Sequence, residues 1–153
     1  MAKDIVLATD GSAYSFQAAR FIAQSGLLPD GGVVRVLHVM ANLPARVSRF
    51  VDAGAIQEWY GEESAKVLKP TAEILSQAGV PHVVDSRIGF APQEITRYAD
   101  EVDAHMIVMG AHGRGVLLDA VIGSVAGRVL ALTHRPVLLI QHPGDEQDQD
   151  QPR

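Results

Sequence analysis

Short apolar runs alternate along the chain with longer segments in which apolar residues recur at helical spacing. Ile5 to Ala8 is a continuous apolar run, which is typical of a strand buried on both faces of a parallel sheet. Strands are predicted at residues 5–8, 33–40, 80–88, 105–109 and 136–141. Helices are predicted at residues 12–26, 59–77, 91–101 and 124–133. This alternation predicts an α/β fold, a doubly wound parallel sheet with helices on both faces.

Three segments depart from the regular pattern. Residues 41–57 have no clean period, so we expect a long connection there. Pro70 falls inside the helical pattern of residues 59–77, and it should kink that helix or split it in two because proline removes a backbone hydrogen bond. Residues 144–153 are polar, acidic and free of aliphatic side chains, which predicts a disordered tail after a single domain spanning residues 1–143.

Composition and charge narrow the classes of function. The chain has 153 residues, of which 47% are hydrophobic, and it has no cysteine. It is long enough for one domain with a real core, and it lacks the residue that a disulfide scaffold or a thiol nucleophile requires. The net charge of −5 argues against nucleic-acid binding, which needs a basic face. No apolar run is long enough to span a bilayer and no signal-peptide pattern is present, so we expect no membrane partner and a cytoplasmic location.

The strongest candidate for chemistry is a glycine-rich segment after the fourth strand. Ligands of doubly wound sheets bind beyond the carboxyl ends of the strands, where the strand order reverses. Gly110, Gly113, Gly115 and Gly123 lie in this region, and we expect them to take positive φ angles and let the backbone approach a ligand. Backbone N–H groups there, together with the helix that Ser124 opens, would suit a phosphate chain.

Other interpretations of this segment remain open. The glycines could serve only a tight turn from strand to helix, and Arg114 could either assist a phosphate or point into solvent. The segment is neither a Walker loop, since it has no lysine, nor a dinucleotide fingerprint, since Leu118 occupies the place of the last glycine.

The spacing of this segment carries a family resemblance. Gly110, Gly113, Gly123 and Ser124 follow the pattern of glycine, two residues, glycine, nine residues, glycine, then serine or threonine. In this the chain resembles the universal stress protein family. The similarity extends to the opening segment 3–12, to 36–39 and to 135–140, so it covers nearly the whole chain apart from about 41–57 and the acidic tail. It implies a five-stranded sheet in the order 3-2-1-4-5, of the adenine nucleotide alpha hydrolase-like type, and a homodimer.

The resemblance also implies a set of binding residues, because family members that keep the motif bind ATP. Carried over position by position, the nucleotide-binding residues are Ala8, Thr9, Asp10, Val39, Met109, Gly110, Gly113, Gly123, Ser124 and Val125, and Arg114 is a further candidate for its charge. Asp10 would help to hold Mg²⁺ or Mn²⁺, since a carboxylate beside a triphosphate needs a bridging cation. Asp10 could instead only cap the helix that follows. Ala126 stands where some ATP-binding relatives have a hydroxyl group, so one phosphate contact would be missing.

These observations predict an ATP-binding regulatory homodimer, in which occupancy by ATP, ADP or AMP modulates binding of a partner protein in a stress response. Residues 41–57 are the candidate responsive segment. The alternatives are a slow Mg²⁺-dependent ATPase, an autophosphorylating protein modified at Ser124, and a purely structural dimer. We predict no catalytic residue, because the motif region offers one carboxylate, no lysine and no evident base.

The last strand is the predicted dimer interface. Val137 to Ile140 is an uncharged run, and the family-like strand order places it at the edge of the sheet. An apolar edge invites association unless it is covered. Pairing with a second copy would cover it and bury Val137 and Leu139, although the acidic tail or a helix could cover it instead.

Overall fold

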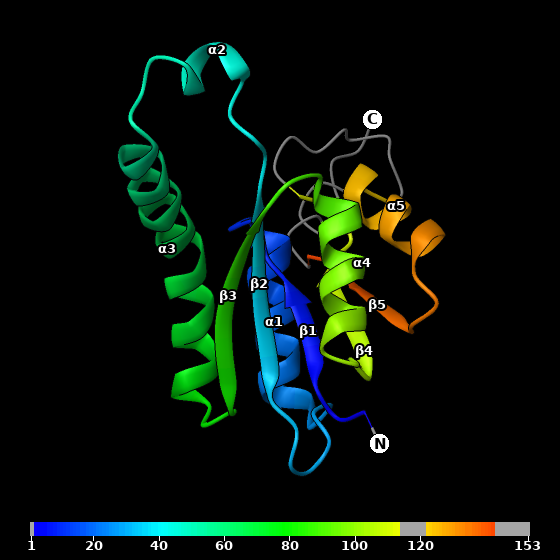
Figure 1. Ribbon diagram of the computed structural model, residues 1–153. Helices are drawn as coiled ribbons and strands as arrows, with labels where there is room; N and C mark the ends of the chain where they lie inside the picture. The colour runs from blue at the N-terminus through cyan, green and yellow to red at the C-terminus, as the bar shows by residue number, and fades with distance from the viewer. Residues whose placement is uncertain (1, 114–121, 143–153) are drawn as a thin grey trace, which may run out of the picture.

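The computed structural model describes residues 2–113 and 122–142. Its strands are β1 (Ile5–Ala8), β2 (Val34–Met40), β3 (His82–Ile88), β4 (Met106–Gly110) and β5 (Val137–Ile140). Its helices are α1 (Ala13–Ser25), α2 (Ala45–Ser48), α3 (Ala53–Gln77), α4 (Ala91–Glu101) and α5 (Ser124–Leu132). All neighbouring strands are parallel and the sheet order is β3-β2-β1-β4-β5 (Figure 1). The predicted α/β fold and strand order are confirmed.

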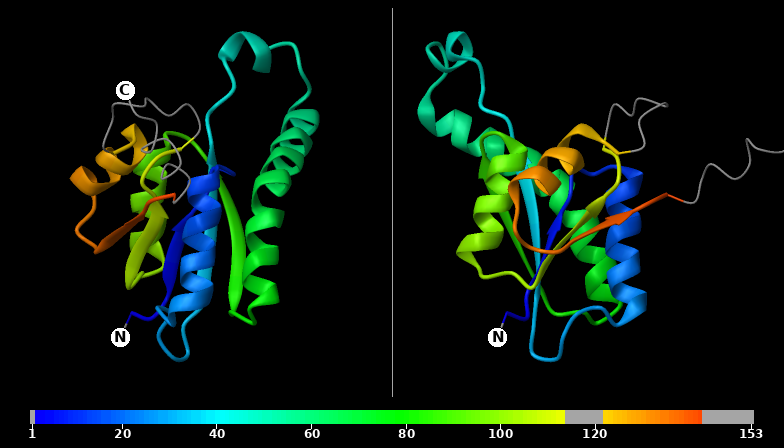
Figure 2. Two further views of the ribbon diagram at one scale, coloured as in Figure 1. Left: turned by 180° about the vertical axis from the view of Figure 1, so that it is seen from behind. Right: turned by 90° about the vertical axis from the view of Figure 1, so that its right-hand side faces the viewer.

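Two layers of helices cover the sheet, with α1 and α3 on one face and α4 and α5 on the other (Figure 2). β1 lies at the centre of the sheet, and its alternate side chains serve the two layers. Ile5 and Leu7 pack with α1 and α3, whereas Val6 and Ala8 pack with α4 and α5. Both faces of this strand are therefore buried, which explains why its sequence is apolar throughout rather than alternating.

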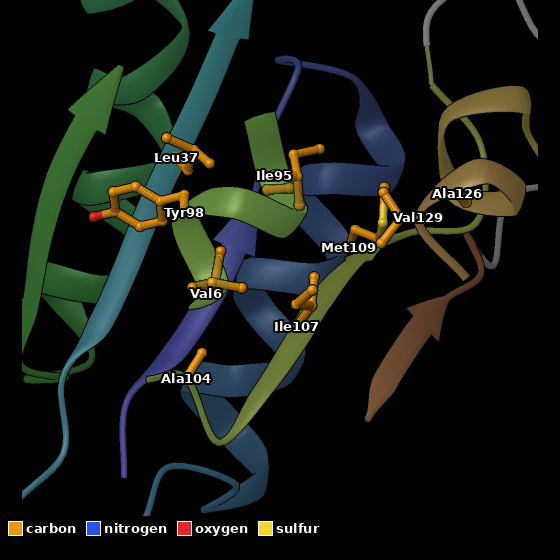
Figure 3. Close-up of a cluster of buried hydrophobic side chains, with 11 residues drawn as sticks. Val6, Leu37, Ile95, Tyr98, Ala104, Ile107, Met109, Ala126 and Val129 are labelled. Carbon is orange, nitrogen blue, oxygen red and sulfur yellow. The ribbon is translucent and has the colours of Figure 1, made fainter. Parts of the chain in front are cut away.

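The layer that contains α4 and α5 positions the site. Figure 3 shows Val6 and Ile107 on neighbouring strands, with Ile95 from α4 and Val129 from α5 closing over them. None of these four side chains is more than 4% exposed. Burial of an aliphatic side chain of this size contributes about 1.5–3 kcal/mol, so this cluster fixes where α4 and α5 lie relative to the carboxyl ends of the strands.

The structure corrects the predicted connection at residues 41–57. Residues 45–48 form α2 and α3 begins at Ala53 rather than near Trp59. The start of α3 is set by Asp52, whose Oδ2 accepts the N–H groups of Gly54 and Ala55 at 3.0 and 3.3 Å. An aspartate at this position satisfies N–H groups that have no partner within the helix.

The structure also shows that Pro70 does not split α3, which runs unbroken over 25 residues. Leu68, Thr71 and Leu75 around the proline are buried against the rest of the molecule, and this packing holds the turn that lacks one backbone bond. Although α3 is long, no helix of the described residues is both long and apolar enough to cross a membrane.

The segment that joins β2 to α3 lies beyond the carboxyl edge of the sheet, away from α4 and α5 (Figure 1). We call residues 41–52 the arm. Residues 44–52 are all exposed, and Phe50, at 88%, is the most exposed large hydrophobic residue of those that the structure describes. The arm is therefore attached through β2 at one end and α3 at the other, and near β2 the Tyr60 hydroxyl of α3 donates to the Ala41 carbonyl and accepts the Leu43 N–H.

Candidate functional site

A cavity of about 210 Å³ lies at the carboxyl ends of β1, β2 and β4. At this place the chain leaves β1 for α1 on one face of the sheet and leaves β4 for α5 on the other face. Such a reversal opens a crevice between the departing loops. The cavity lies where the strand order predicted a ligand site.

The cavity brings together the residues that the sequence indicated. Its wall includes Ala8, Thr9, Asp10, Val39, Met109, Gly110, Gly113, Gly123, Ser124 and Val125. Arg114, the other predicted residue, lies outside the described residues. The wall further includes Ala126, which the family resemblance placed at a phosphate contact without its hydroxyl group. It also includes seven residues that the sequence analysis did not assign to the site: Ser15, Leu37, His38, Ala91, Ile95, Ala111 and His112.

The turn after β1 places the Asp10 carboxylate in the cavity. Gly11 has a φ of 78°, which suits glycine, and it turns the chain toward α1. Asp10 Oδ1 accepts the N–H of Ser12 at 2.9 Å, and Ser12 caps α1 by accepting the N–H of Ser15 at 3.3 Å. Asp10 therefore shapes the turn and lines the cavity, whereas the cap of α1 is Ser12 rather than Asp10.

The motif glycines are required for a different reason from the one predicted. Gly110, Gly113 and Gly123 do not have positive φ angles, so that expectation is wrong for them, and Gly115 lies outside the described residues. A Cβ on Gly110 would stand 2.6 Å from Tyr14 Cβ, and one on Gly113 would collide with Asp10 Oδ2. These glycines allow close packing of the β4–α5 loop against the β1–α1 turn.

The start of α5 presents backbone donors to the cavity. Gly123 is its N-cap, with no side chain to cap the helix, and its own N–H donates to the Ala111 carbonyl at 2.7 Å. The first intrahelical bond runs from Gly127 N–H to the Gly123 carbonyl at 2.9 Å. The N–H groups of Ser124 and Val125 precede that bond, and donors in this position favour an anion.

The floor of the cavity is apolar and continuous with the core. Leu37, Ile95, Met109 and Ala126 line the cavity and belong to the buried cluster in Figure 3. The sequence analysis missed Leu37 and Ile95 because a core residue and a residue that lines an apolar cavity are chemically alike. The available signal for Leu37 was its place two residues before Val39 on the same predicted strand.

Hydroxyl groups and a histidine form the side of the floor that faces α1 and α3. Thr9 Oγ1 donates to Ser15 Oγ at 3.0 Å and lies 3.3 Å from Thr71 Oγ1 on α3. His38 Nδ1 lies 2.8 Å from the Thr9 carbonyl oxygen. A carbonyl can only accept, so Nδ1 carries a hydrogen, and in the neutral ring Nε2 is left as an acceptor.

The charge of the cavity is set by few groups. Among the described residues that line it, Asp10 is the only carboxylate and there is no lysine or arginine. No cluster of three or more metal-binding side chains occurs in the part of the chain that the structure describes. A cation at Asp10 would thus need further oxygen ligands from a bound molecule or from water, which is how Mg²⁺ is commonly held.

Comparison with known proteins identifies the family and the fold of this chain. The model of the universal stress protein family matches residues 1–141. A universal stress protein of Methanocaldococcus jannaschii is 32% identical over 148 residues, which cover 94% of this chain and 85% of the relative. A solved structure from the same organism superimposes with a TM-score of 0.78 at 23% identity, covering 94% of this chain and 99% of the other, and this likeness shows the fold.

A second solved structure, the universal stress protein from Archaeoglobus fulgidus in complex with dAMP, has a TM-score of 0.65 and 27% identity. The alignment covers 92% of this chain and 98% of that one. The family match spans most of the chain, and the sheet order and the cavity lie where the motif predicts them. The chain belongs to the universal stress protein family and has its adenine nucleotide alpha hydrolase-like fold.

Proposed function

We propose that this protein binds an adenine nucleotide, with ATP, ADP and AMP as candidates, in the cavity at the carboxyl ends of β1, β2 and β4. One observation carries the proposal. Ten predicted binding residues from separate segments of the chain line this single cavity. The Archaeoglobus fulgidus relative, whose structure was solved in complex with dAMP, supports an adenine nucleotide as the ligand class.

The two ends of the cavity suit the two ends of a nucleotide. A base would lie on the apolar floor formed by Leu37, Ile95 and Met109, beside Val39 on β2. The phosphates would lie against Gly113 and the N-terminus of α5, where Ser124 adds a hydroxyl group that is exposed. Backbone donors and the positive end of the helix dipole favour phosphate there.

Asp10 would hold Mg²⁺ or Mn²⁺ together with phosphate oxygens. The carboxylate lines the cavity and its Oδ2 faces Gly113. A bound cation would neutralise the phosphates, which otherwise repel this carboxylate. The cation is thus expected to strengthen binding of ATP more than binding of AMP, which carries fewer phosphates.

The charge of the cavity supports a regulatory role rather than catalysis. Rapid phosphoryl transfer needs cationic groups that clamp the phosphates and a group that orients the nucleophile. In the described part of the wall the only titratable side chains are Asp10, His38 and His112. We infer that occupancy of the cavity changes the surface that a partner protein recognises, in a stress response, with the arm as the responsive segment.

We also propose that the protein forms a homodimer in which the β5 strands of two copies pair. Ile107 N–H donates to the Pro136 carbonyl and Ala111 N–H to the Ile140 carbonyl, both at 2.9 Å. Because alternate residues of a strand direct their backbone groups to opposite sides, Val137 and Leu139 present theirs to the free edge. The other edge strand, β3, carries Asp85 and Arg87, which discourage pairing there.

Thermal melting of nucleotide-stripped protein tests the binding proposal. At about one hundred times its dissociation constant, Mg·ATP should add about 2.7 kcal/mol, or roughly 5–10 °C for a domain of this size. Gly113→Val should lose the shift because its side chain enters the cavity. Gly127→Val is the matched control, since a Cβ on Gly127 meets nothing within 4 Å. Absence of a shift in the unaltered protein, with ATP, ADP and AMP alike, would overturn the proposal.

Two further measurements test the remaining parts. Steady release of ADP over many turnovers, abolished in Asp10→Asn, would replace the regulatory role by that of a slow ATPase.

Sedimentation should show a dimer that Leu139→Pro dissociates, because proline removes an N–H group that β5 directs to its free edge. The control variant Leu139→Ala keeps that N–H group and should remain a dimer. If the unaltered protein sediments as a monomer, the predicted interface is wrong.

A further inference from the structure

A second cavity of about 290 Å³ adjoins the nucleotide cavity. The two cavities share Val39, Ala91, Ser124 and Val125 in their walls. The second cavity is closed further out by Ala41, Gly89, Phe90, Pro92 and Arg128. A ligand that fills the first cavity can therefore extend into the second without crossing the core.

The outer wall of the second cavity offers an aromatic ring and a positive charge. The Arg128 guanidinium lies 5.3 Å from the centroid of the Phe90 ring, and the Phe90 side chain is 49% exposed. Arg128 is the only charged residue in this wall, and no ion pair joins it to a carboxylate of the described residues. An exposed ring beside an arginine is suited to stacking on a nucleobase.

The turn that carries Phe90 is fixed by its backbone conformation and by a hydrogen bond to β2. Gly89 has a φ of 151°, which few other residues adopt, and a Cβ there would stand 2.9 Å from Glu94 Cγ. The N–H of Gly89 donates to the Met40 carbonyl at 2.8 Å, which ties this turn to the end of β2. The exposed position of the Phe90 ring is thus set by the backbone around it.

The helix α5 connects the two cavities. Ser124 lies at its first turn, in the proposed phosphate site, and Arg128 follows four residues later on the same face. A phosphate chain that passes Ser124 along the helix would approach the Arg128 cation. The ligand group beyond those phosphates would then meet Phe90.

We propose that the second cavity binds the distal nucleoside of a dinucleoside polyphosphate whose first adenosine occupies the nucleotide cavity. This inference rests on the proposed function. The chemistry that recognises the ligand is a second base on Phe90 and a phosphate beside Arg128. A mononucleotide satisfies only the first cavity.

Calorimetric titration of the full chain tests this inference with three probes. ATP reports on the first cavity, diadenosine tetraphosphate reaches both, and adenosine 5′-tetraphosphate has the same phosphates without the second adenosine. Stacking of one further base should make diadenosine tetraphosphate bind about tenfold more tightly than adenosine tetraphosphate. Phe90→Leu should remove that preference, whereas Arg128→Gln should weaken binding of both tetraphosphates because each carries the phosphate that would lie beside this cation.

The variants and controls separate the possible outcomes. Phe90 and Arg128 do not line the first cavity, so both variants should bind ATP as the unaltered protein does. Arg20→Gln, which changes an exposed arginine on α1, should leave every affinity unchanged. Equal affinity for the two tetraphosphates, or a preference that survives in Phe90→Leu, would overturn this inference while ATP binding still stands. Failure to bind ATP would overturn the proposed function as well.

Discussion

The two ends of the parallel sheet are held together in different ways. At the amino ends of the strands, charged groups join neighbouring elements. Asp4 accepts hydrogen bonds from Arg35 Nε at 2.7 Å and from Val33 N–H at 3.1 Å. Arg135 reaches Asp100 at 2.9 Å, Asp103 at 3.2 Å and the carbonyl of Ala104. Neither cavity reaches the amino ends of the strands, which we call the amino edge; their carboxyl ends form the carboxyl edge.

At the carboxyl ends the same strands diverge around the cavity. Close packing of Gly110 against Tyr14 and of Gly113 against Asp10 takes the place of ion pairs. None of the ion pairs within the described residues involves the cavity wall. The difference indicates that the ion pairs between strands and their neighbouring elements are concentrated at the amino ends, whereas the carboxyl ends surround the cavity without them. Variants at the two edges should therefore separate stability from binding.

The largest loss of stability is expected from Gly32→Ala at the amino edge. A Cβ there would collide with the Lys3 backbone carbonyl and lie 3.2 Å from Leu28 Cδ1. Overpacking against backbone costs about 1–3 kcal/mol, so the melting temperature should fall by roughly 2–12 °C. Nucleotide affinity should be unchanged because the site is at the opposite edge.

Gly61→Ala is the control for this variant. Gly61 lies inside α3, and a Cβ there meets nothing within 4 Å. Alanine should raise the free energy of unfolding by about 0.5–1 kcal/mol through its better helix propensity. A Gly32→Ala protein that melts like the unaltered one would contradict the close packing of this edge.

A smaller loss is expected from Arg135→Gln. The change removes two ion pairs and weakens the contact with the Ala104 carbonyl, which holds the turn between α4 and β4. Asp100 and Asp103 are 70% and 77% exposed, so most of the effect comes from the carbonyl, at about 1 kcal/mol. Chemical denaturation should show this loss, and a decrease in nucleotide affinity alongside it would contradict the separation of the edges.

The Asp4–Arg35 pair predicts a dependence on acid at the amino edge. Burial would raise the pKa of Asp4, but the hydrogen bonds from Arg35 and Val33 outweigh it and hold that pKa below its ordinary value of 3.8. The pair therefore stabilises the fold above that value and loses its effect as the pH falls through the folded-state pKa.

This contribution should be below about 1 kcal/mol, because both side chains are partly exposed. Unfolding free energies measured from pH 5 down to pH 2.5, roughly the range in which a lowered aspartate titrates, should fall less steeply for Asp4→Asn than for the unaltered protein. Parallel curves would show that the pair has no such role.

The smallest change in stability is expected from Gly113→Ala at the carboxyl edge. The new methyl group meets the far end of the Asp10 side chain, and turning that carboxylate aside weakens its hydrogen bond with Ser12 N–H, so the free energy of unfolding should fall by about 0.5 kcal/mol. The displaced carboxylate should nonetheless reduce the gain in melting temperature that Mg·ATP produces. A large loss of stability with normal binding would reverse the comparison between the edges.

The hydrophobic pattern alone was sufficient to place the strands of the parallel sheet because buried parallel strands have a distinctive composition, and the family resemblance supplied the order of the strands. β1 shows this, since all four of its residues are buried. It was insufficient for the start of α3, because the exposed residues 53–55 carry no apolar period and the only signal was the capping aspartate at 52. An exposed helical turn is held by local hydrogen bonds, which a hydrophobic pattern does not record.

For the candidate site too, some features could be predicted from the sequence and others only from the structure. The glycine spacing pointed to a family, and the family resemblance supplied the residues that line the cavity. The reason for Gly110 and Gly113 lay instead in contacts with Tyr14 and Asp10, about one hundred residues away in the chain. Phe90 and Arg128, which form the second cavity, carry no motif at all. Such features arise only when the fold brings distant segments together, so they had to be found in the structure.

The arm has a consequence for engineering. Its residues 44–52 are exposed throughout, and its ends are anchored by β2 and by the capped start of α3. Insertions are best tolerated where the chain is exposed and few contacts are lost. A circularly permuted fluorescent domain placed after Arg49 would stand beyond the carboxyl edge, joined through β2 to Val39 in the cavity wall. The architecture thus offers a frame for an optical sensor of the nucleotide that we propose as the ligand.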